Sequence, residues 1–185
     1  MNLNVSAAPH IRSKDSTSKI MLDVLIALVP ALIAAVIIFG FRALVLTAIS
    51  AAACVVFEAL MCLAMRRKMT VGDLSAVVTG VLLAFSLPVS CPYWVVIVGD
   101  AFAIIVVKGL VGGLGQNIFN PALGGRAFMM LFWPSAVTRF TTDSVSAGAF
   151  GGVDIVASVT PMQNMHMGSL PADTSLVNMF LGNHG

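Results

Sequence analysis

Charged side chains are what this sequence has least of. Asp, Glu, Lys and Arg make up 10% of its 185 residues, against roughly 25% in an average soluble domain. So little charge cannot cover a folded surface in water, and the mean hydropathy of +0.98 also indicates a chain dissolved largely in lipid. The formal net charge of +2 provides no basic stripe, so the composition argues against a nucleic-acid-binding protein.

Reactive and metal-binding side chains are also sparse. Cys54, Cys62 and Cys91 form an odd set without metal-ligand spacing, and we expect them to be buried as small apolar residues. The three histidines are far apart in loops. No nucleophile and base stand together, so the sequence predicts neither a catalytic residue nor a metal site. No small-residue cleavage site follows the first apolar run, and we expect that helix to stay in the protein.

Long apolar runs are what the sequence does have. They predict an all-α, polytopic transmembrane domain over residues 20–134 with about five spans, because about twenty apolar residues cross a hydrocarbon core of ~30 Å. A polar segment, 1–19, precedes this domain, and a polar segment without predicted helices, 135–185, follows it. We expect Pro30 to kink the first span. The runs cover residues 20–41, 43–65, 74–87, 93–110 and, as the last and short one, 122–132.

Basic residues give an orientation. They cluster before the first span and directly after the second, at residues 12, 14 and 19 and at residues 66–68. Lys and Arg favour the cytoplasmic side, so we expect a cytoplasmic N-terminus and an extracytoplasmic segment 135–185.

The stretch from Lys108 to Ala122, KGLVGGLGQNIFNPA, interrupts the apolar pattern. Its glycines, asparagines and proline cannot continue a regular membrane helix, and such backbone is tolerated only where protein or a wet cavity surrounds it. We expect a broken or re-entrant element, a feature that often marks ligand or ion sites. It lacks the spacing of a nucleotide-binding P-loop. The candidate residues here are Gly112, Gly113, Gly115, Asn117 and Asn120.

Three charged residues lie inside or near the end of predicted spans. They are Glu58, Asp100 and Lys108. Ionised groups at membrane depth are costly and often serve ion paths, so these residues are candidates for one. Two structural alternatives stay open: polar contacts between helices, and a Lys108 side chain that extends to the cytoplasmic interface.

Four stretches of the sequence are distinctive. They are SAAPH with SKIM near the N-terminus, DLSAVVTGVLLAFSL followed by proline, KGLVGGLGQNIFNPA, and the segment that ends Val159-Thr160-Pro161-Met162. With these stretches the chain resembles a known family, the D subunit of the Rnf electron-transport complex. The Rnf subunit is in turn similar to the B subunit of the sodium-pumping NADH:quinone oxidoreductase. Together these stretches span almost the whole chain.

The resemblance implies a membrane subunit of a ferredoxin:NAD⁺-type, ion-translocating oxidoreductase. In the family, FMN is attached through its phosphate to a threonine, and Thr160 stands at that position. Asp154 begins the motif and Pro161 follows the threonine. Ile155, Ala157 and Val159 replace the family's glycine, serine and alanine, and Ser158 supplies a hydroxyl one position late.

Further expectations follow from the same resemblance. The chain would be the first half of an inverted-repeat fold, with a second flavin, riboflavin, held by the half that is not present. Its partners would be the other subunits of the complex, a flavin transferase and the lipid of a bacterial cytoplasmic (inner) membrane. Electrons would be relayed with coupled transport of Na⁺ or H⁺. Three other interpretations remain open: a flavin-free channel or transporter scaffold, a structural anchor for partners, and a stand-alone membrane enzyme.

Overall fold

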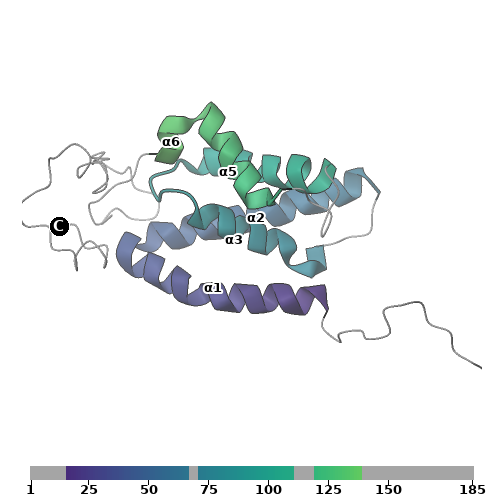
Figure 1. The fold of residues 1–185 in the computed structure, drawn as a ribbon, viewed down its shortest axis with the longest axis horizontal. Helices are drawn as coiled ribbons and strands as arrows, with labels where there is room; N and C mark the ends of the chain where they lie inside the picture. The colour runs from purple at the N-terminus through teal and green to yellow at the C-terminus, as the bar shows by residue number, and fades with distance from the viewer. Residues whose placement is uncertain (1–15, 67–70, 111–118, 139–185) are drawn as a thin grey trace, which may run out of the picture.

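The computed structural model describes residues 16–66, 71–110 and 119–138, and these residues form helices without a strand (Figure 1). This agrees with the all-α class predicted above. In chain order the elements are α1 (Thr17–Phe39), α2 (Phe41–Ala64), the 3-10 helix η1 (Val71–Asp73), α3 (Ser75–Phe85), α4 (Tyr93–Ala101), the π-helix η2 (Phe102–Leu110), α5 (Pro121–Phe132) and α6 (Pro134–Thr138).

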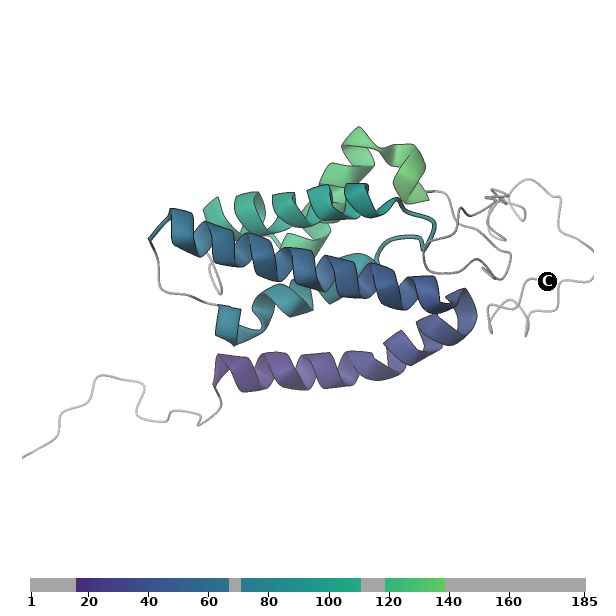
Figure 2. The same ribbon diagram turned by 180° about the vertical axis from the view of Figure 1, so that it is seen from behind.

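The first two helices form a long antiparallel hairpin (Figure 2). The side chain of Ser16 accepts a hydrogen bond from the Lys19 amide, so α1 begins three residues before the predicted span. A single residue, Gly40, joins the helices at φ 78°, which is a left-handed conformation that favours glycine. With 23 and 24 residues, α1 and α2 are the two described helices that are long and apolar enough to cross a membrane. Pro30 lies inside α1 without ending it.

α1 contributes no buried residue, although its side chains are strongly apolar. Ile26, Ile33 and Ile37 are among its exposed side chains. An exposed apolar surface of this extent is unfavourable in water and favourable against lipid or another apolar surface. The outer position of α1 in both views agrees with this interpretation (Figures 1 and 2).

Two helices of the bundle are too short to cross a membrane. α3 has 11 residues and α5 has 12, which at 1.5 Å per residue gives about 16–18 Å. α3 packs mainly on α2 and also contacts α1, α4 and α5. A Cβ atom added at Gly80 would lie 2.7 Å from the Cα of Ala51, so the backbones of α2 and α3 touch at this glycine.

The fourth predicted span is helical as expected from Tyr93 to Leu110, but its second half is not an α-helix. At Phe102 the chain passes from α4 into the nine-residue π-helix η2. The rings of Phe102 and Phe128 stack 4.2 Å apart, which fixes the beginning of η2 against α5. π-helical segments are rare in proteins, and those that occur are often found at functional sites. The residues that contact η2 are therefore candidates for a functional site.

The fifth predicted span corresponds to α5. The Asn120 side chain accepts a hydrogen bond from the Ala122 amide, and Pro121 occupies the first turn, where its missing N–H costs nothing. One expectation was wrong beyond this helix. No helix is predicted after Pro134, yet that proline begins the short helix α6 because the first helical position tolerates proline.

Arg42 ties the hairpin to the segment between α3 and α4. Its guanidinium Nε donates a hydrogen bond of 2.9 Å to the Val89 carbonyl. The same guanidinium lies 5.1 Å from the ring centre of Tyr93, a cation–π contact. The α1–α2 turn and the start of α4 are therefore held together at one end of the bundle.

Candidate functional site

Buried polar side chains form a stripe along the inner face of α2. Ser50, Cys54 and Glu58 are spaced by four residues, which places them on one face of the helix. All three are buried, and their partners lie on α3, α4 and η2. The stripe therefore belongs to two polar clusters, one at the level of α4 and one at the level of η2.

The first group, the Asp100 cluster, comprises Ser50, Cys54, Asp100 and the Gly80 carbonyl. Asp100 is 0% exposed. The Ser50 hydroxyl lies 2.8 Å from Asp100 Oδ1 and 2.9 Å from the Gly80 carbonyl oxygen. The Cys54 thiol lies 3.3 Å from the same Oδ1. Asp100 thus links α4 to α2, and Ser50 links α2 to α3.

The second group, the Lys108 cluster, comprises Glu58, Ser75 and Lys108. The Lys108 ammonium forms an ion pair with Glu58 Oε1 and donates a hydrogen bond of 2.7 Å to Ser75 Oγ. Lys108 is only 7% exposed, so its side chain does not extend to the interface and that alternative is wrong. The ammonium instead joins η2 to α2 and to the first turn of α3.

These clusters can serve two chemical purposes. Charged and polar groups in a dry interior stabilise helix contacts when paired, and the same groups can form steps of an ion path. Their arrangement along a single interface, from Ser50 to Glu58 on α2, suits either purpose. The Asp100 and Lys108 clusters together are the candidate site.

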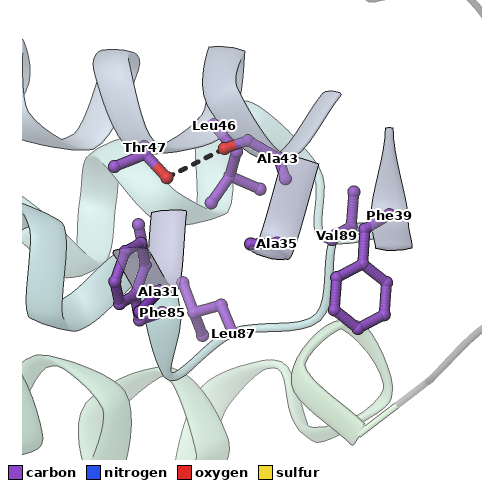
Figure 3. A pocket seen from close by; sticks show the side chains of 10 residues that line it. Ala31, Ala35, Phe39, Ala43, Leu46, Thr47, Phe85, Leu87 and Val89 are labelled. Atoms are coloured by element: carbon purple, nitrogen blue, oxygen red, sulfur yellow. Dashed lines mark hydrogen bonds between the residues drawn. The ribbon is translucent and has the colours of Figure 1, made fainter. Parts of the chain in front are cut away.

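An apolar cavity lies apart from both clusters, where the ends of α1, α2 and α3 meet (Figure 3). Its volume is about 220 Å³. The hydroxyl in its wall, that of Thr47, already donates to the Ala43 carbonyl at 2.8 Å. Small alanine side chains and Phe39, Leu46, Phe85, Leu87 and Val89 provide most of the rest of the wall. The cavity therefore suits an apolar group rather than an ion.

The sequence profile of the NQR2, RnfD, RnfE family matches residues 4–185. The chain belongs to this family. This match and the individual relatives together confirm the resemblance to the D subunit of the Rnf complex.

Individual relatives agree with the family. The chain is 44% identical over 185 residues, all of its length, to the D subunit of the Na⁺-translocating ferredoxin:NAD⁺ oxidoreductase complex of Acetobacterium woodii, and covers 56% of that protein. It is 42% identical over 158 residues to the D subunit of the proton-translocating ferredoxin:NAD⁺ oxidoreductase complex of Clostridium ljungdahlii, covering 85% of this chain and 46% of that one. It is 30% identical over 194 residues to the D subunit of the ion-translocating oxidoreductase complex of Shewanella amazonensis, covering 98% and 56%. The chain thus spans about half the length of these relatives.

The structure separates the site residues that the sequence predicts for this family member into three groups. Glu58, Asp100 and Lys108 are buried as expected, but the two acids do not share a cluster. Asn120 caps α5 and is exposed. The other candidates lie outside the described residues: Gly112, Gly113, Gly115, Asn117, Asp154, Ser158, Thr160 and Pro161.

Three residues of the site were missed from the sequence. Ser50, Cys54 and Ser75 bring a hydroxyl or a thiol to the buried charges. The four-residue spacing that Ser50 and Cys54 share with Glu58 was the available signal. No comparable pattern identifies Ser75, because its partner on η2 is 33 residues away. Within the described ranges, no group of three or more His, Cys, Asp or Glu side chains could hold a metal ion.

Proposed function

We propose that this chain is part of the D subunit of an ion-translocating ferredoxin:NAD⁺ oxidoreductase complex in a bacterial inner membrane. It would carry FMN as a phosphoester on Thr160 and relay electrons with coupled movement of Na⁺ or H⁺. The 44% identity over all 185 residues to the Acetobacterium woodii protein carries this proposal. The flavin supplies the redox chemistry when bound, and the protein supplies its position and surroundings.

Buried charge in an apolar helical bundle supports the ion-coupled part of the proposal. Lys108 and Glu58 pair inside the helices, and Asp100 is fully buried one cluster away. Such groups are expensive at membrane depth and are kept mainly where they perform a task. The partners of the chain would be the other membrane and membrane-associated subunits, lipid, and a flavin transferase that reaches the Thr160 segment before assembly.

A flavin-free channel or transporter-like scaffold is the second candidate function. The observation in its favour is that both polar clusters form without any flavin-binding residue. The two functions differ in a simple measurement, because a covalent flavin stays with the polypeptide and fluoresces on a denaturing gel. The scaffold would show no such fluorescence.

Replacing Thr160 by valine tests flavin attachment. Valine nearly preserves the shape of threonine and lacks the oxygen that a phosphoester requires. We expect Thr160→Val to abolish covalent flavin and electron transfer through the complex while membrane insertion is unchanged. Thr160→Ser keeps an oxygen and should retain some attachment, which makes it the matched control. The peptide that contains Thr160 should carry the mass of one FMN less one water.

Fluorescence that persists in Thr160→Val would contradict the assignment and direct attention to Ser158. Absence of covalent flavin from the natural protein, isolated from cells that contain the transferase, would favour the scaffold instead.

A further inference from the structure

Asp100 is a buried carboxyl without a cationic partner. It is 0% exposed, and its Oδ2 atom has no hydrogen-bond partner among the described residues. The ammonium of Lys108 is directed to Glu58 and Ser75 instead. An unpaired carboxylate in such a place has a high free-energy cost, which a proton on the carboxyl removes.

The other helices packed on α4 supply no compensating charge. α2 presents the Cys54 thiol to Asp100, and Glu58 of the same helix is itself acidic and pairs with Lys108. α3 contributes the carbonyl of Gly80, through Ser50. α5 carries Arg126, which forms no ion pair with Asp100.

The number of hydrogen atoms available at Ser50 is a second, independent indication that Asp100 carries a proton. The Ser50 hydroxyl has one proton, yet two oxygen atoms lie within hydrogen-bond distance of it, those of Gly80 and Asp100. A carbonyl oxygen only accepts, and a carboxylate also only accepts. A proton on Asp100 Oδ1 resolves the conflict, because that O–H donates to Ser50 Oγ and the Ser50 O–H donates to Gly80.

The spacing of these oxygen atoms matches hydrogen bonds better than it matches ligands around one metal ion. Ca²⁺, whose radius is close to that of Na⁺, sits about 2.3–2.6 Å from its ligand oxygens and holds them further apart than a hydrogen bond does. The Ser50 oxygen instead lies 2.8 Å and 2.9 Å from its two neighbours. A thiol, the remaining neighbour of Oδ1, is a poor ligand for such hard cations.

We propose that Asp100 is a proton-binding site in the interior of the helical bundle, occupied when α2, α3 and α4 are packed as described. Binding is the reaction of the carboxylate with one proton to give the neutral acid. Release of that proton requires Ser50 to turn its O–H from the Gly80 carbonyl to Asp100. Proton occupancy at Asp100 is therefore coupled to whether Ser50 donates to α3 or to α4. This inference does not depend on flavin attachment at Thr160.

Infrared spectroscopy tests the protonation state directly. The natural protein is purified from its membranes with the subunits that accompany it, beside Asp100→Asn and the control Asp23→Asn, which changes an exposed carboxyl in the same way. We expect the natural protein to show the C=O stretching band of a neutral carboxylic acid, shifted in D₂O. The band should be absent from Asp100→Asn and present in Asp23→Asn. Exchanging NaCl for choline chloride should leave it unchanged.

Two results would overturn the proposal. One is loss of only carboxylate bands in Asp100→Asn, which would mean that Asp100 is ionised. The other is disappearance of the acid band on addition of Na⁺, which would identify a metal-cation site. Ser50→Ala keeps the proposal testable if Asp100→Asn fails to assemble. Removing the acceptor of the Asp100 O–H should move the acid band to higher frequency, and an unmoved band would contradict the arrangement.

Discussion

Lys108 joins three elements through one ammonium group. It lies on η2 and contacts Glu58 on α2 and Ser75 on α3, all three buried. A buried ion pair contributes little compared with apolar residues of the same size, but the removal of one partner leaves an uncompensated charge. The importance of Lys108 is therefore best measured by separating those two situations.

We expect Lys108→Met to lower the free energy of unfolding by about 3–5 kcal/mol, because Glu58 loses its ion pair with Lys108 at a position that excludes water. The double variant Lys108→Met, Glu58→Leu removes both charges and should recover most of this loss. Thermal unfolding of the purified protein with its accompanying subunits measures both effects. Arg66→Met, at an exposed position, is the control for loss of a positive charge. If Lys108→Met is no less stable than this control, the ion pair does not stabilise the folded protein.

Cys91, between α3 and α4, is a buried thiol whose chemistry depends on pH. Burial raises the pKa of Cys91 from 9.0 to about 11, although the charge of Arg42 lowers it. The thiolate is the reactive form, so we expect Cys91 in the folded protein to resist alkylation at pH 8 and to react after denaturation. Peptide mass mapping measures this, with an exposed Ser135→Cys as the reactive control. Rapid native alkylation of Cys91 would contradict its burial.

The sign of the pH effect on stability follows from the same shift. Folding favours the protonated thiol, so the contribution of Cys91 is complete below pH 9.0. It falls as the pH rises from 9.0 to about 11, because the unfolded chain loses the proton first. We expect Cys91→Ser to remove this part of the loss of stability at alkaline pH.

At the scale of elements, the contact between α2 and α3 depends on Gly80. A Cβ atom there would meet the backbone of α2, at 2.7 Å from Ala51 Cα and 2.8 Å from the Ser50 carbonyl oxygen. Because backbone cannot rotate away as a side chain can, we expect Gly80→Ala to force the helices apart and to reduce the amount of assembled protein severely. Gly72→Ala is the matched control, since nothing lies within 4 Å of its added Cβ.

The outcome for both glycine variants is measured as the amount of protein that stays folded in detergent after extraction from membranes. Normal recovery of Gly80→Ala would mean that α2 and α3 are not held at the distance described. The same substitution also displaces Ser50, which contacts both Gly80 and Asp100. If some Gly80→Ala protein is recovered, the infrared acid band of its Asp100 should therefore be shifted.

The sequence predicts where the helices begin and end better than it predicts whether they are α- or π-helical. Local signals define several ends: Ser16 before α1, Gly40 after it, and Asn120 with Pro121 at α5. The π-helix has no such signal, because residues 102–110 are as apolar as the α-helix before them. Hydrogen bonding to a carbonyl five residues back is decided by packing, here against Phe128 and Glu58.

The charged members of the candidate site are predictable from the sequence, whereas their uncharged neighbours and their pairing are not. Charge inside an apolar run identifies Glu58, Asp100 and Lys108 as buried groups. Their partners lie on other helices, 33 to 50 residues away, and side-chain spacing along one helix carries no information about such contacts. The flavin segment around Thr160 rests on resemblance alone, because it lies outside the described residues.

At the scale of the whole molecule, the hairpin places the start of α1 and the end of α2 at one end, and α6 near the other (Figures 1 and 2). Lys19 in the first turn of α1 and Arg66 after the end of α2 lie at the first end, so we expect it to be cytoplasmic. In right-side-out vesicles Ser135→Cys should react with an impermeant maleimide, and Arg66→Cys should react only after permeabilisation. Both positions are exposed, whereas the three natural cysteines are buried. The reverse pattern would invert the orientation.

Gly40 is the single residue between α1 and α2, so the two helices cannot separate far from each other. We therefore expect them to insert into the bilayer together, as a hairpin. Glu58 then enters the membrane before Lys108, which follows it by 50 residues along the chain. The same interval separates Ser50 from Asp100. Through that period the polar stripe of α2 has to be shielded by the insertion machinery or by water, because lipid offers it no partner. The hairpin is therefore an early intermediate of biogenesis that becomes fully compatible with lipid only when the fourth segment emerges.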